Sequence, residues 1–322
     1  MADKKLMVGG QAVIEGVMMR SPRAVSVACR KPDGTIVVKI DPYRPLTHRW
    51  KWLNLPFFRG AMVLIESLVL GVKALVFSGD VAMLAEKAHA STPGETRSLL
   101  KKSFWEQVRM FAMLAFSLAV GILLFFYIPL ILTDWLGAET GFWFNLIDGA
   151  IRLLFFLAYL FLITLMKDIR RVFEYHGAEH KSIFAFEHQA ELTPAAAAKF
   201  SRFHPRCGTS FLLIVMIVSI FVFMALGRPE TVGDRLFRLA FIPVIGGISY
   251  ELIRLSDRGF QNRFWRMFIL PGLWLQHLTT REPDESQLEV AIVALKAALG
   301  KDLSEHTDIE VLDTQTPLRK VA

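Results

Sequence analysis

The chain has 322 residues, of which 53% are hydrophobic and 21% are charged, and its mean hydropathy is +0.40. This composition excludes an ordinary soluble protein, and two isolated cysteines exclude a disulfide framework. The net charge of +7 is typical of loops that face anionic lipid, so we expect membrane lipid as a partner. Because no basic patch is interleaved with aromatic residues, we expect no nucleic-acid partner.

Residues 1–55 have soluble character and contain the pattern of a small cytoplasmic β element. Two short apolar runs flank the turn sequence Pro32-Asp33-Gly34, which predicts a β-hairpin over 24–40. The preceding stretch, GGQAVIEGVMMRSP, predicts either an edge strand with a tight bend or a loop folded over a site. Glu15 lies in this stretch and is a candidate polar site residue.

Residues 56–280 form the predicted membrane domain. Four segments have the length needed to cross about 30 Å of hydrocarbon: 110–133, 142–166, 209–226 and, more weakly, 236–253. Segment 57–78 carries Glu66 and Lys73, and segment 264–278 is short, so we expect both to be re-entrant or to lie at the interface. The predicted fold class is therefore mainly α, a polytopic α-helical membrane protein with about four transmembrane helices and a small N-terminal β-hairpin element.

Residues 281–322 return to soluble character and are predicted to be cytoplasmic. The run QLEVAIVALKAAL has helical apolar periodicity and stops at Gly300, which predicts a helix followed by a mobile tail of about twenty residues. The connection TDWLGAETG between the first two spans has no Lys or Arg, whereas Lys167, Arg170 and Arg171 follow the second span. The positive-inside rule then puts loop 167–207 and both termini in the cytoplasm.

The stretch His176-Gly-Ala-Glu179-His180 carries the most specific chemistry. On a helix these three side chains share one face, where two imidazoles one turn apart can bind a transition metal. The H-x-x-E-H order is that of the inverted zinc peptidases, in which Glu179 would act as ligand or general base. His204 and Cys207, three residues apart, could complete the shell. A closed four-ligand site would be structural, whereas three ligands and a water would make it catalytic.

Each of these residues also has an ordinary explanation. A histidine near a membrane is often a hydrogen-bonded structural residue, Cys207 could be a small core side chain, and Glu179 could pair with Lys181 or Arg206. Taken together they are harder to dismiss, because four of the eight histidines fall within loop 167–207. We therefore predict that the site binds a divalent metal, zinc.

Glu251, near the cytoplasmic end of the fourth span, is a further candidate site residue. A carboxylate there is costly unless it finds a partner, so a functional role is one hypothesis. An ion pair with Arg254 or Arg258 is the ordinary alternative.

Several of these motifs occur together, in order, from about residue 7 to about residue 300. The stretches GGQAVIEGVMMRSP, EYHGAEHKSIFAFE, HPRCGTSF, GISYE, LQHLTTREP and DESQLEVAIVAL resemble the YqhQ-like family of bacterial multi-pass membrane proteins, a domain family of unknown function. The resemblance implies a location in the bacterial plasma membrane. It also carries the label of a predicted metal-dependent enzyme, but it implies no substrate.

Three classes of function are compatible with these patterns. The first is a zinc-type metal-dependent hydrolase that acts at the membrane surface, with Glu179 as general base. The alternative is a non-catalytic factor for membrane-protein assembly or translocation, whose partners would be other membrane proteins. A transporter is less favoured, because the intramembrane charges Asp148 and Arg152 are not accompanied by a repeated half-structure.

Overall fold

The structure is a computed structural model that describes residues 8–46, 55–56, 58–88, 104–137, 140–258, 263–304, 308–313 and 319–321. Its strands are β1 (Gly9–Val13), β2 (Gly16–Arg20), β3 (Ala24–Arg30), β4 (Ile36–Pro42), β5 (Ile309–Asp313) and β6 (Arg319–Val321). Its helices are α2 (Phe58–Ala88), α3 (Phe104–Ile122), α4 (Ile128–Trp135), α5 (Gly141–Ile163), α6 (Lys167–Glu187), α7 (Pro194–Ala197), α8 (Gly208–Leu226), α9 (Val232–Ala240), α10 (Ile242–Arg258), α11 (Arg263–Thr279) and α12 (Glu285–Leu299). A π-helical turn, η3 (Leu123–Tyr127), joins α3 to α4.

The six strands form one sheet in the order β1-β2-β3-β4-β5-β6. Strands β1 to β4 are an antiparallel meander, β5 pairs parallel to β4, and β6 pairs antiparallel to β5. The predicted hairpin is strands β3 and β4, and the glycine-rich stretch before it is the edge hairpin of β1 and β2 with its bend at Glu15. Of the two alternatives for that stretch, the edge strand with a tight bend is the one that forms.

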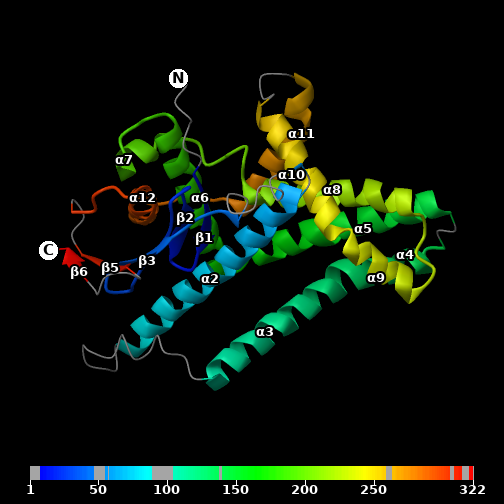
Figure 1. Cartoon of the computed structure of the whole chain (residues 1–322), viewed down its shortest axis with the longest axis horizontal. Coiled ribbons are helices and arrows are strands. Elements are labelled where there is room, and N and C mark those ends of the chain that lie inside the picture. Colours follow the sequence, from blue (N-terminus) through cyan, green and yellow to red (C-terminus); the bar gives the residue numbers. More distant parts are fainter. Residues whose placement is uncertain are drawn as a thin grey trace.

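Helices cover both faces of this sheet (Figure 1). Because successive residues of a strand point to opposite faces, Val17, Met19 and Ala28 face α12 and α6 on one side. Met18 and Val27 on the other side pack against the second half of α2. The sheet is therefore the middle layer of an α/β/α sandwich, and this sandwich lies outside the helical bundle.

Helix α12 forms the centre of the larger core, as its apolar periodicity predicted. It begins at Asp284, whose side chain accepts a hydrogen bond from the Gln287 N–H in a capping box, and it ends at Gly300 in the left-handed conformation. The tail beyond it differs from the prediction, because Ile309–Asp313 forms strand β5. Residues 305–307, 314–318 and 322 of the predicted tail lie outside the described residues.

In the part of the chain that the structure describes, five helical segments are long and apolar enough to cross a membrane, judged by length and composition: Arg59–Met83, Phe111–Trp135, Gly141–Ile163, Gly208–Leu226 and Val232–Leu255. The last four coincide with the four predicted spans. The intramembrane charges Asp148 and Arg152, which lie in the segment Gly141–Ile163, are both buried and form an ion pair at 2.9 Å. In Figure 1, α5 and α8 run side by side away from the sheet, toward the end where α4 and α9 lie.

Candidate metal centre

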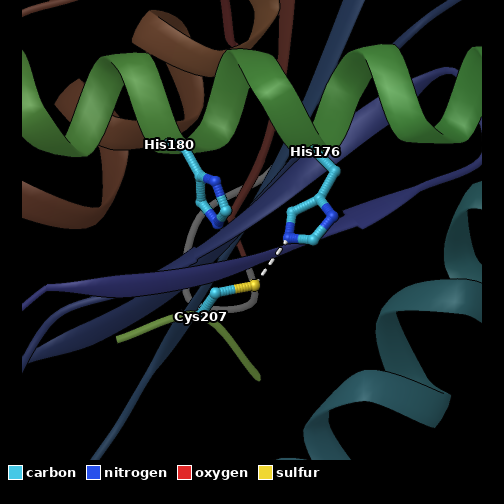
Figure 2. Close-up of side chains that lie close together, drawn as sticks. All are labelled: His176, His180 and Cys207. Atoms are coloured by element: carbon cyan, nitrogen blue, oxygen red, sulfur yellow. Dashed lines mark hydrogen bonds between the residues drawn. The ribbon is translucent and has the colours of Figure 1, made fainter. Parts of the chain in front are cut away.

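Helix α6 presents both histidines of the H-x-x-E-H motif on one face, as the spacing predicted. Their ring centroids are 4.4 Å apart, and both side chains point from the helix toward Cys207 (Figure 2). Helix α6 is fixed by α12 and β1, and the chain at Arg281 crosses it closely at Gly177. An added Cβ at Gly177 would overlap the Arg281 carbonyl oxygen, so this position requires glycine.

Backbone carbonyls orient the two imidazole rings. The Nδ1 atom of His176 lies 2.7 Å from the Thr279 carbonyl oxygen, and the Nδ1 atom of His180 lies 2.5 Å from the Arg202 carbonyl oxygen. A carbonyl can only accept, so each ring carries a proton on Nδ1, and in its neutral form Nε2 is free to act as an electron-pair donor. The same second-shell arrangement is usual for histidines that bind metals.

Cys207 lies opposite these rings at the first turn of α8, where it is the N-cap residue. Its Sγ atom is 3.2 Å from Nε2 of His176 and 3.1 Å from Oγ1 of Thr209. Burial alone would raise the pKa of this thiol, but His176 and His180 lower it well below its usual value. The positive end of the α8 dipole favours the thiolate as well.

The pKa of His176 shifts in the direction opposite to that of Cys207. Burial would lower the pKa of His176, but the neighbouring Cys207 and Glu179 and the Thr279 carbonyl together raise it to about 9. These two directions favour a thiolate at Cys207 beside a protonated His176 when no metal is bound. A divalent cation replacing the His176 proton would meet a ligand that is already anionic.

Three ligand atoms converge at this point. One atom each from His176, His180 and Cys207 lies within 4.8 Å of the others, and no further His, Cys, Asp or Glu joins them among the described residues. Two imidazoles and one thiolate are a donor set that zinc prefers. The residues present therefore fit a metal ion of this kind.

Glu179 borders the group without belonging to it. Its side chain is 5% exposed, and its carboxylate accepts a hydrogen bond from the Gly10 backbone N–H of β1. Burial raises its pKa, and the nearby His180 and His176 partly oppose that rise. A Cβ at Gly10 would lie 2.9 Å from Cγ of Glu179, which explains why this strand carries a glycine there.

His204, the other predicted ligand, lies apart from the three converging atoms. Its ring packs on Phe184, with 4.5 Å between the ring centroids, and its Nε2 lies 3.6 Å from a carboxylate oxygen of Glu187. Its backbone N–H and carbonyl are both bonded to the fully buried side chain of Gln276, each at 2.8 Å. His204 therefore lies beside the candidate centre, and the hydrogen bonds between its backbone and Gln276 anchor the turn that carries Cys207.

Comparison with known proteins finds a matching family model and a similar protein, but no similar solved structure. Residues 55–301 match the model of a family described as "Protein of unknown function (DUF1385)". The chain is also 34% identical over 314 residues to "Uncharacterized protein YqhQ" of Bacillus subtilis (strain 168), covering 92% of this chain and 94% of that protein. The chain belongs to this family. No solved structure matches it.

The two remaining site candidates of this DUF1385 member form ion pairs elsewhere. Glu15 pairs with Arg171 of α6 and accepts a hydrogen bond from the Tyr175 hydroxyl at 3.3 Å, so it holds the β1–β2 bend against α6. Glu251 of α10 pairs with Arg59 of α2, with Nε to Oε1 at 2.6 Å. The ordinary alternative of an ion pair is what forms at Glu251, with Arg59 as a partner; the side chain of Arg258 lies outside the described residues.

The residues that position the site were not identified from the sequence. Gln276 and Thr279 lie in the polar run LQHLTTREP, to which the sequence analysis gave no role in the site, and the Thr279 and Arg202 contacts use main-chain carbonyls. A carbonyl is present at every position, so no residue type marks it. The density of polar residues around Gln276 was the one available indication.

Proposed function

We propose that this protein binds one divalent metal ion, zinc, through His176, His180 and Cys207 at the cytoplasmic surface of the bacterial plasma membrane. The observation that carries the proposal is the convergence of three ligand atoms within 4.8 Å. At usual bond lengths, two ligands of a tetrahedral zinc ion lie about 3.5 Å apart. Small side-chain rotations are therefore enough for all three atoms to contact one ion.

The proposed site lies at the membrane boundary. Cys207 directly precedes α8, whose residues Gly208–Leu226 form one of the apolar segments, while both histidines belong to the sheet-packed helix α6. Three protein ligands leave one coordination position for water, which is the arrangement of catalytic rather than structural zinc sites. We therefore infer a metal-dependent hydrolase whose substrate is itself held at the membrane surface.

The chain's own residues would support hydrolysis in specific ways. When bound, zinc supplies Lewis acidity and lowers the pKa of a water molecule. The two Nδ1–H···O=C hydrogen bonds fix the imidazoles, and Thr209 steadies the thiolate. Glu179, a buried carboxylate with a raised pKa, can hold a proton next to the site and is our candidate general base.

Metal content of purified variants tests the proposal. We expect about one zinc ion per wild-type chain, and loss of that zinc in His180→Ala and in Cys207→Ala, because each change removes a ligand. Two matched controls should keep the ion. His188→Ala removes a histidine of the same region whose Nδ1 only meets the Phe184 carbonyl, and Cys29→Ala removes the other cysteine, which is buried in the sheet.

The measurement is elemental analysis of protein purified without chelators, repeated after zinc loading and dialysis. Wild-type protein that stays zinc-free in both preparations, while folded, contradicts the proposal. Equal zinc in wild type, His180→Ala and Cys207→Ala contradicts it as well, since the ion would then be bound elsewhere.

The variant Glu179→Gln distinguishes the hydrolase hypothesis from the alternative of a non-catalytic assembly factor. This change keeps the acceptor for the Gly10 N–H but removes the basic oxygen, so zinc should remain while function in a deletion strain should be lost. Complementation by Glu179→Gln as full as by wild type would contradict catalysis through Glu179 and favour a non-catalytic role with other membrane proteins.

A further inference from the structure

The sheet constrains how many helices can cross the membrane. Strand β5, near the C-terminus, pairs with β4, so the two ends of the chain lie on the same side. Helix α6 packs against β1 and its Arg171 pairs with Glu15, so α6 lies on that side too. Between β4 and α6 the chain must therefore cross an even number of times. The described residues of this interval hold three apolar segments, Arg59–Met83, Phe111–Trp135 and Gly141–Ile163.

Of these three segments, the one in α2 makes contacts that are incompatible with crossing the membrane. Glu66 accepts hydrogen bonds from the Tyr43 hydroxyl at 3.1 Å and from the Leu46 N–H at 2.6 Å. Further along, the Ile14 N–H donates to Oγ of Ser78, and Phe77 and Val81 pack into the core under the sheet. Contacts to the sheet domain thus span Glu66 to Val81, about 22 Å of helix.

A crossing α2 would carry this sheet into the hydrocarbon. Lipid-exposed sheet edges are not tolerated there, because their backbone groups lack partners. The sheet also carries charged side chains, among them Arg30, Lys31 and Lys39, that form ion pairs around its rim. The sheet-contacting part of α2 must therefore lie outside the hydrocarbon core.

The first turns of α2 connect it to the membrane bundle. Arg59 pairs with Glu251, and Gly60 lies against Gly247 and Tyr250, near the end of the apolar segment Val232–Leu255. In Figure 1, α2 starts beside α10 and then runs along the sheet, away from the direction taken by α5 and α8. Helix α2 therefore begins at the membrane boundary and leaves the bundle.

The opposite face of α2 is an apolar stripe, which we define as the exposed residues Ile65, Leu68, Val69, Leu75 and Met83 together with the half-buried Val72. Leu68 is 66% exposed and Met83 is 55% exposed, comparable to Leu118 and Phe221 of the crossing helices at 65% and 63%. A helix with a sheet on one face and exposed leucine on the other needs an apolar neighbour. Lys73, also exposed, can extend its amine to the headgroups.

We propose that α2 lies flat in the sheet-side leaflet, with its apolar stripe in contact with lipid, so that four of the five apolar segments cross. The stripe contacts lipid rather than a protein, because α2 starts at the end of the crossing segment Val232–Leu255. Its contact with α10 there sets the depth of α2 at the membrane boundary. Helix α2 then anchors the sheet domain, and with it the candidate metal centre, on the membrane.

Depth measurements on single-cysteine labels test this proposal in reconstituted bilayers. Nitroxide labels at Leu68→Cys, Val72→Cys and Met83→Cys should all report the same shallow depth from the ratio of oxygen to nickel accessibility. Labels at Leu114→Cys and Leu123→Cys, each 49% exposed, are the matched crossing control and should differ in depth, because they lie near the end and at the middle of the segment Phe111–Trp135. Unmodified protein gives the background, since Cys29 and Cys207 are buried.

Sidedness gives a second, independent readout. Asp33→Cys lies in the exposed hairpin turn and marks the side of the sheet. A membrane-impermeant maleimide added from that side should also label Met83→Cys. The proposal is overturned if Met83→Cys reacts only from the side that labels Leu136→Cys, or if depth rises to a maximum at Val72 and falls again at Met83. A stripe label accessible to nickel but not to oxygen would overturn the lipid contact itself.

Discussion

Gly177→Ala is expected to lower the stability of the protein by about 3 kcal/mol, the upper end for inserting one methyl group into a packed site. The added Cβ would overlap the Arg281 carbonyl oxygen and lie 3.3 Å from Cδ of Pro283. The crossing chain cannot simply move away, because the Arg281 N–H donates to the Phe173 carbonyl of the same helix at 2.8 Å. We expect the melting temperature to fall by roughly 5–10 °C.

The same substitution should weaken zinc binding. Moving the Arg281 chain displaces Thr279, whose carbonyl orients His176, and loss of such a second-shell partner reduces metal affinity about 10- to 100-fold. The matched control is Gly79→Ala in α2, where an added Cβ meets no atom within 4 Å. Helix propensity makes that change neutral or stabilising by up to about 1 kcal/mol. Equal melting temperatures for Gly177→Ala and wild type would contradict the packing described here.

Gln276→Leu is expected to be similarly damaging, for a polar rather than a steric reason. The Gln276 amide bonds both backbone groups of His204, and its Nε2 also lies 3.0 Å from Oγ of Ser210. Leucine would remove the acceptor of the His204 N–H, at about 1–3 kcal/mol for a buried donor, whereas the His204 carbonyl would keep the hydrogen bond from the Cys207 N–H at 3.3 Å. The turn from His204 to Cys207 would loosen, so we expect both a lower melting temperature and weaker zinc binding.

Gln276→Glu provides the graded comparison. Its carboxylate can still accept from the His204 N–H but cannot donate to the His204 carbonyl, so its effect on zinc affinity should be smaller than that of leucine. Thermal unfolding followed by tryptophan fluorescence, and competition for zinc with a chelator, measure the two effects. Unchanged zinc affinity in Gln276→Leu would show that this side chain does not position Cys207.

The local part of the candidate site could be predicted from the sequence. His176 and His180 share a face because four residues make one helical turn, and α6 forms as that spacing requires. The convergence with Cys207 was also anticipated, although it depends on how α8 is placed against α6. His204 could not be placed in the same way, because the short turn before α8 directs its ring to Phe184 and Glu187 instead.

The non-local part of the fold could not be predicted. The strand Ile309–Asp313 was assigned to a tail because five residues give a weak pattern and their partner, β4, lies far upstream. The joining of both chain ends in one sheet follows from that pairing. The same pairing leads to the even number of membrane crossings between β4 and α6. The loop charges in the sequence had indicated this topology only in outline.

The most direct test of the central claim is X-ray absorption at the zinc edge of the purified wild-type protein. The account predicts one sulfur and two imidazole nitrogens among the zinc ligands, with the sulfur contribution lost in Cys207→Ser and retained in Cys29→Ser. A zinc ion surrounded by oxygen ligands alone, or a sulfur contribution that survives Cys207→Ser, would contradict it.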